Sequence, residues 1–146
     1  MLGYVCKYTP MELFEAMDTE ITRLEPSVTD FNHADTLMHA NICSYTKAVL
    51  EDVMEHDYEG VILTTCCDSI RRLYDTLKSQ FPDKFFFLLD IPRKFNDFAV
   101  TLYERQLKQM LTEYEAFSGK TLDLKRFVSM MQNKAALKKQ LSLIHI

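Results

Sequence analysis

The sequence predicts an α/β protein built on a parallel β-sheet, followed by two long helices. Two apolar runs, residues 61–65 and 85–89, flank a helical pattern over residues 68–81, and two longer helical patterns come after them. Neither run alternates with polar residues, which is typical of strands buried on both faces of a parallel sheet. A strand, a helix and a second strand in this order predict a right-handed crossover unit.

The first forty residues predict shorter elements. Residues 2–8 and 20–24 are each expected to form a strand, and Pro10 is well placed to start a helix over residues 11–17. Residues 27–41 are polar and lack a sustained period, so a long loop is expected there. Loops of this length in a small domain are often functional.

The helices that follow have recognisable starts and ends. A helix is expected from Ser44 to about His56, with Ser44 as its N-cap, and Asp68 is expected to cap the next one. A long helix is expected over residues 96–117, ending before Gly119. The last is expected from about residue 123, and its inner face is expected to carry Leu124, Phe127, Val128 and Met131.

Composition excludes several classes of function. The chain has 146 residues, one domain by length, and only three glycines, too far apart for a phosphate-binding loop of the ATP or NAD type. The formal charge is -4 and the basic residues are scattered, which disfavours nucleic-acid binding. No apolar run approaches the ~20 residues of a membrane span, and the N-terminus lacks a signal-peptide pattern. We therefore expect a cytoplasmic protein.

The four cysteines are the main candidates for chemistry. Cys66 and Cys67 lie where a buried strand turns into a helix, and Cys43 and Cys6 also precede expected helices. Partial positive charge at a helix N-terminus favours the thiolate that metals bind, so the pattern is compatible with a metal or iron–sulfur site built from several loops. The alternative is that these cysteines only pack as small apolar residues. No C-x-x-C pair is present.

Other polar residues give weaker signals. His33, His39, His56 and His145 are expected to be exposed surface residues. Arg71 and Arg72 could hold an acidic ligand group, although adjacent arginines on a helix more often form a solvated face. The sequence assigns no catalytic residue.

Four segments in order resemble the 2-hydroxyacyl-CoA dehydratase family, which includes benzoyl-CoA reductase subunits, and specifically its iron–sulfur, D-component type. The segments are GYVCKYTPMELFEAM (residues 3–17), NICSYTK (41–47), TTCCDSIRRLY (64–74) and LLDIPR (88–93). The resemblance implies an α/β fold with Rossmann-like (flavodoxin-like) halves. It also implies a [4Fe-4S] cluster held by three cysteines from separated segments.

By position, Cys43 matches the first family ligand and Cys67 the second. The third comes from the later half of the family's subunits, and no cysteine follows Cys67 in this sequence. Cys6 and Cys66 could substitute, or the chain could be an N-terminal fragment, which is the interpretation we favour. Residues 1–93 then form a cluster-binding half-domain, and residues 94–140 a helical segment leading to a second half. Residues 141–146, LSLIHI, resemble a translated sequencing adapter, which leaves their native origin open.

The resemblance implies a function as well. The family eliminates water from a 2-hydroxyacyl-CoA through a ketyl radical, with electrons from an ATP-hydrolysing iron–sulfur activator, and works with a related subunit as a heterodimer or homodimer. The fragment alone is expected to be inactive. The alternatives are a benzoyl-CoA reductase-type subunit, a non-enzymatic electron-transfer or cluster-carrier protein, or a fragment whose thiols merely pack.

Overall fold

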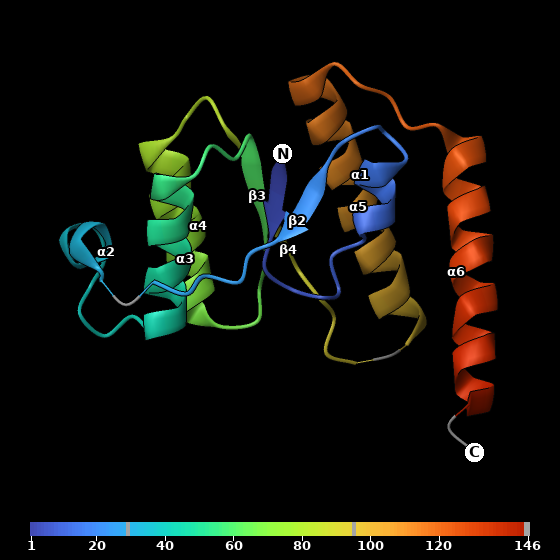
Figure 1. The fold of residues 1–146 in the computed structure, drawn as a ribbon, viewed down its shortest axis with the longest axis horizontal. Coiled ribbons are helices and arrows are strands. Elements are labelled where there is room, and N and C mark those ends of the chain that lie inside the picture. The colour runs from blue at the N-terminus through green and yellow to red at the C-terminus, as the bar shows by residue number, and fades with distance from the viewer. Residues whose placement is uncertain (29, 95, 145–146) are drawn as a thin grey trace.

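The computed structural model, which describes residues 1–28, 30–94 and 96–144, confirms the α/β class. The described residues form a four-stranded, all-parallel sheet in the order β2-β1-β3-β4 (Figure 1). The strands are β1 (Leu2–Tyr4), β2 (Ile21–Arg23), β3 (Gly60–Thr64) and β4 (Phe85–Leu89). The buried strand pair expected around the crossover therefore forms the β3–β4 half of this sheet.

The strand order places a topological switch point between β1 and β3. β1 lies between β2 and β3, so the chain leaves β1 toward one side of the sheet and later returns to add β3 on the other. The helices that follow β1 and β3, α1 (Met11–Glu15) and α4 (Asp68–Gln80), lie on opposite faces (Figure 1). Loops that diverge in this way at the carboxyl ends of parallel strands leave the crevice where open α/β sheets bind ligands.

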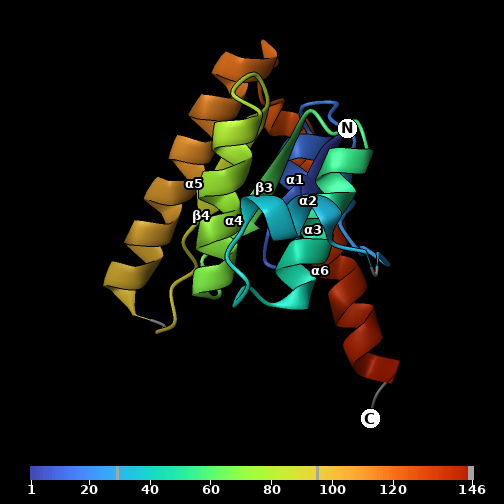
Figure 2. The ribbon, with the colours of Figure 1, turned by 90° about the vertical axis from the view of Figure 1, so that its left-hand side faces the viewer.

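Helices cover both faces of the sheet. α3 (Ser44–Glu55) and α4 cover one face, with α2 (Asn32–Leu37) outside them, as Figure 2 shows from that side. α1 and α5 (Asp97–Ser118) cover the other, with α6 (Leu124–Ile144) outermost. Within β3, Val61 and Leu63 pack toward α3 and α4, whereas Ile62 packs toward α1 and α5. The unbroken apolar run of β3 is thus explained by burial on both faces.

Tyr114 anchors α5 to the sheet. Its ring is fully buried and makes edge-on contacts with Phe14 and Phe85, with centroids 5.1 and 5.0 Å away. Its hydroxyl donates to Glu59 at 2.8 Å and lies 3.0 Å from the Thr19 hydroxyl. Burial raises the pKa of Tyr114 to about 12, so the hydroxyl stays protonated.

The expected loop over residues 27–41 is wrong in part, because it contains the short helix α2. The carboxylate of Glu51 in α3, whose side chain is only 3% exposed, accepts the Ala34 backbone N–H at 2.7 Å and contacts Nδ1 of His33 at 2.7 Å. A buried carboxylate that meets an otherwise unsatisfied helix N–H stabilises this helical turn. The helix therefore depends on a partner 17 residues away, which local sequence patterns do not show.

The expected N-caps are also wrong by one residue. α3 and α4 begin at Ser44 and Asp68 themselves, and the N-cap residues are Cys43 and Cys67. Neither cap side chain bonds to a backbone N–H of its helix in the part of the chain that the structure describes. By contrast, Gly119 ends α5 as expected, with a left-handed φ of 70°. Thiols thus occupy positions that usually hold hydroxyl or carboxylate caps.

The expected inner face of α6 is mostly wrong. Leu124, Val128 and Met131 are 65%, 45% and 43% exposed, and of the expected four only Phe127 packs against the core cluster of the α5 face. The reason is that α6 lies mainly against the short helix α1 rather than against the sheet. Ion pairs join it to α1 and the turn after it, namely Arg126 with Asp18 and Lys134 with Glu12.

α6 continues to Ile144, while His145 and Ile146 lie outside the described residues, so the foreign origin of residues 141–146 stays a prediction. Within the described ranges, no helix combines the length and the apolar character needed to cross a bilayer.

Gly60 provides a test of the β3–β4 pairing. A Cβ built on Gly60 would lie 2.0 Å from the Phe85 carbonyl oxygen, a backbone atom that cannot rotate away. We expect Gly60→Ala to lower the free energy of unfolding by about 1–3 kcal/mol, measured by urea denaturation. The control is Gly3→Ala, where the new Cβ meets only Leu24 side-chain atoms at 3.0 Å or more, and an equal loss in both variants would contradict the argument.

Candidate thiol site at the carboxyl edge of the sheet

All four cysteines lie in segments that meet at the same edge of the molecule. Cys6 follows β1, Cys66 and Cys67 follow β3, and Cys43 immediately precedes α3. The amino ends of α3, α4 and α5 lie at the bottom in Figure 1, with the loops that leave the strands. This is the edge at which the connections after β1 and β3 diverge, so the structure brings the predicted cysteine segments to the place where such sheets bind ligands.

Cys43 carries the more acidic thiol of the site. The residue is exposed, and its Sγ lies 3.2 Å from Oγ1 of Thr46, a residue that is completely buried. This hydrogen bond is the main reason why the pKa of Cys43 is lowered, and the hydroxyl of Ser69 contributes in the same direction. Ser69 is the second residue of α4, so the Cys43 thiol lies beside the first turn of the helix that Cys67 caps.

Cys66 and Cys67 form a tight turn between β3 and α4. The Cys66 N–H donates to the Thr64 carbonyl at 2.7 Å, and the Cys67 carbonyl accepts the Arg71 N–H at 3.4 Å. Both residues are exposed. Partial burial of the Cys66 thiol raises its pKa, so Cys66 ionises less readily than Cys43. Cys67 is the N-cap residue of α4, a helix of 13 residues.

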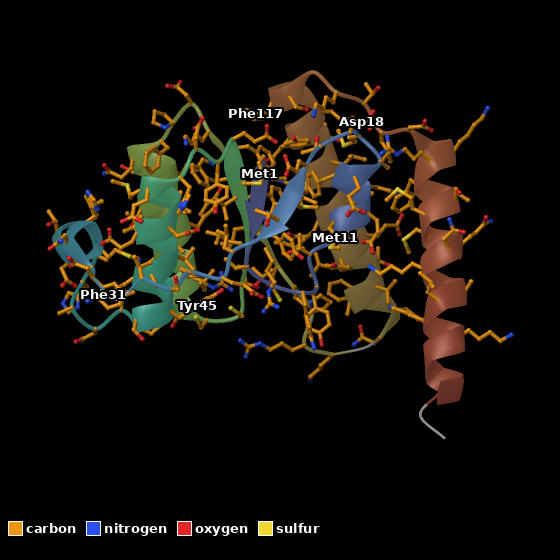
Figure 3. The ribbon with its side chains drawn as sticks, in the orientation of Figure 1. Met1, Met11, Asp18, Phe31, Tyr45 and Phe117 are labelled. Atoms are coloured by element: carbon orange, nitrogen blue, oxygen red, sulfur yellow. The ribbon has the colours of Figure 1, made fainter. Side chains whose placement is uncertain are left out.

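Cys6 is half-buried and lies among tyrosines. Tyr45, in the first turn of α3, interacts electrostatically with both Cys6 and Cys66, and Figure 3 shows it at the same edge. Burial is the main cause of the raised pKa of Tyr45, while Arg23 opposes it. Tyr103 of α5 also interacts with Cys6, and its hydroxyl donates to the Tyr8 carbonyl at 3.2 Å. Protonated phenols thus lie beside the thiols and can donate hydrogen bonds.

Asp90 and Thr65 fasten β3 to the edge strand β4 just before the cysteine turn. The Thr65 hydroxyl donates to Oδ1 of Asp90, and the Thr65 N–H donates to the Leu89 carbonyl at 3.0 Å. The Asp90 N–H in turn donates to Oε1 of Gln106 in α5 at 3.2 Å. Sequence reasoning missed this pair, although an acidic residue directly after a buried strand is a signal that could have found Asp90.

The residues other than cysteine add little to the site. His33, His39 and His56 are exposed, as predicted, and His33 and His56 contact Glu51 and Asp52. Arg71 and Arg72 are exposed and line a hollow of about 370 Å³ between α4 and the edge strand β4. The other lining residues are Asp68, Tyr74, Asp75 and Leu88.

The donor set fits part of an iron–sulfur site. Thiolates are the ligands that such clusters require, and Cys43 and Cys67 place two thiols at neighbouring helix starts. In residues 1–28, 30–94 and 96–144, however, no group of three or more His, Cys, Asp or Glu side chains is arranged to hold a metal ion. The described residues therefore offer two compatible ligands rather than a complete set.

Comparison with known proteins gives one match. Residues 6–145 match the family described as HGD-D, 2-hydroxyglutaryl-CoA dehydratase, D-component. A search of curated proteins found no match. The family match covers all four cysteines, the described helices α1 to α6 and the strands β2, β3 and β4, and it begins just after β1.

The Thr46 hydrogen bond predicts the reactivity of Cys43. We expect Thr46→Val to raise the pKa of Cys43 toward its ordinary value, so that less thiolate is present near neutral pH and alkylation by iodoacetamide slows in proportion. Tryptic peptide 24–47 contains Cys43 as its only cysteine, so mass spectrometry follows this thiol alone. Thr101→Val, which removes an exposed hydroxyl in α5, is the control, and an unchanged Cys43 rate in Thr46→Val would contradict the assignment.

The Thr65–Asp90 bond predicts local stability at the cysteine turn. Thr65→Val removes the hydroxyl that Asp90 accepts, and we expect a loss of about 1 kcal/mol in the free energy of unfolding. Hydrogen exchange should accelerate most in residues 64–68, because the strand ends separate there first. If exchange rises equally throughout the chain, or the turn keeps its protection, the bond does not hold the turn.

Proposed function

Because the chain belongs to the 2-hydroxyglutaryl-CoA dehydratase D-component family, we propose that it is the cluster-binding part of a 2-hydroxyacyl-CoA dehydratase-type subunit. The observation that carries the proposal is the position of Cys43 and Cys67 at adjacent helix starts on the carboxyl edge of the sheet. The proposed reaction is the elimination of water from a 2-hydroxyacyl-CoA by way of a ketyl radical.

In this proposal, Cys43 and Cys67 are two of the three protein ligands of a [4Fe-4S] cluster. The Thr46 hydroxyl stabilises negative charge on the sulfur atom of Cys43. A cysteine from a segment beyond this chain, or else Cys6 or Cys66, supplies the third ligand. When bound, the cluster supplies single-electron transfer and an iron that acts as a Lewis acid toward the substrate.

The chain's own side chains support this site by position. The Thr65–Asp90 hydrogen bond fixes the strand end from which the Cys66–Cys67 turn projects. Tyr45 keeps its proton and can donate a hydrogen bond beside Cys6 and Cys66. Cys43, Cys66 and Cys67 are exposed, so an electron-donating partner can approach them. The proposed partners are a related subunit, an ATP-dependent iron–sulfur activator and an acyl-CoA.

Anaerobic reconstitution tests the ligand assignment. The reduced chain is incubated with ferrous iron, sulfide and 2-mercaptoethanol, which supplies an external thiolate for any ligand the chain lacks. We expect a brown protein with about four irons per chain, and near-complete loss of iron in Cys43→Ser and in Cys67→Ser. Iron and acid-labile sulfide are measured after gel filtration, together with the visible spectrum.

Two further variants make the test selective. Cys66→Ser and Cys6→Ser should retain most of the iron if neither residue is a ligand. Iron-free wild-type protein, or equal loss in all four variants, would contradict the assignment. Titration of the loaded protein with 2-hydroxyacyl-CoA compounds then separates a dehydratase-type subunit from a cluster carrier, because only the former should show a changed cluster spectrum.

A further inference from the structure

Cys66 is not one of the two residues proposed by position as cluster ligands, yet it is covalently next to one of them, Cys67. The two residues occupy the turn between β3 and α4, and both are exposed. They are consecutive in the chain, so one exposed turn carries two neighbouring thiols. A pair of accessible, adjacent thiols is a chemical group in its own right.

From this geometry, we propose that Cys66 and Cys67 form a vicinal dithiol that small-molecule disulfides oxidise reversibly to an intramolecular disulfide. Cys67, at the N-terminus of α4, attacks the reagent and releases one thiol; Cys66 then attacks the mixed disulfide and releases the second. Two protein thiols are oxidised and one small-molecule disulfide is reduced to two thiols. Both protons pass to the departing thiolates, so the exchange needs no other reactant.

Geometry makes the intramolecular product the expected one. The resolving thiol belongs to the adjacent residue of the same turn, so its effective concentration exceeds that of a thiol in dilute solution. The other two cysteines lie in separate segments, after β1 and before α3. Formation of a Cys66–Cys67 bond therefore requires only side-chain rotation and adjustment of one turn.

The same geometry makes the bond easy to reduce. The peptide between the two residues is trans, which sets their Cα atoms about 3.8 Å apart. Disulfides usually join Cα atoms about 4.4–6.8 Å apart, and departures from that range strain the bond and make it more oxidising. A strained bond at an exposed turn forms when disulfides accumulate and opens again when thiols prevail.

The proposal has a consequence for the cluster, and this part alone rests on the proposed function. A sulfur atom in a disulfide has no thiolate to offer to iron. Oxidation of Cys66 and Cys67 would therefore remove Cys67 as a ligand until a thiol reduces the bond. Cys66 would then serve to protect the ligand position of an empty site from irreversible oxidation.

Peptide mapping tests the disulfide on the metal-free chain. The reduced protein is treated with excess glutathione disulfide, quenched in acid, alkylated and digested with trypsin. Peptide 48–71 contains Cys66 and Cys67 and no other cysteine. We expect this peptide to be unalkylated and two hydrogen atoms lighter than its reduced form, with the loss of both of its thiols. Mild thiol treatment should restore both.

Variants separate the intramolecular bond from other products. In Cys66→Ser, Cys67 should keep a stable glutathione adduct because the resolving thiol is gone, whereas Cys43→Ser should behave as wild type. The proposal is overturned if wild-type peptide 48–71 carries two glutathiones, remains fully alkylated, or is linked to the Cys43 peptide. None of these readouts requires iron.

Reconstitution of the oxidised protein tests the consequence. We expect oxidised wild type to lose most of its iron uptake and to regain it after reduction. Cys66→Ser, treated with the disulfide and then reduced, should take up iron as its untreated form does. If the disulfide forms but iron uptake is unchanged, the protective role fails. If the reduced protein takes up no iron, the proposed function fails while the disulfide still stands.

Discussion

The parallel pairing of β3 with both β1 and β4 fixes where every cysteine of this chain lies. Because the strands run the same way, the segments after β1 and β3 leave from one edge, and the helix that returns from β2 starts there as well. The close contact of Gly60 with the Phe85 backbone and the Thr65–Asp90 bond hold β3 and β4 together at opposite ends. The position of the thiols is therefore a property of the sheet rather than of the loops.

The thiols differ because their immediate surroundings differ. Cys43 has a buried hydroxyl that stabilises its thiolate, whereas the Cys66 thiol is partly withdrawn from water and held as a thiol. Both effects arise within a few residues of each cysteine. The order of the strands brings the cysteines to the same edge of the sheet, but the immediate surroundings of each thiol set its pKa. Cysteines at one edge can therefore have separate chemical roles.

Sequence reasoning succeeded where structure is decided by neighbouring residues. The apolar runs of β3 and β4, the long helix ending at Gly119 and the cysteines at helix starts are all local patterns. It failed where an element depends on a residue far away in the sequence. Helix α2 depends on the Glu51 carboxylate, and the role of Asp90 depends on its hydrogen bond with Thr65. The spacing of apolar residues in α6 likewise predicted a helix correctly, but most of the residues expected on its buried face are exposed. Their spacing does not show which neighbouring element the helix packs against.

The attachment of α6 has a consequence for how the molecule responds to ionic strength. The two faces of the sheet are held by apolar contacts, which salt does not weaken, but α6 is joined to α1 and the turn after it by the Arg126–Asp18 and Lys134–Glu12 pairs. Charges at a partly exposed surface are screened as salt rises. Rising salt concentration therefore weakens the ion pairs that attach α6, while the apolar contacts on both faces of the sheet persist.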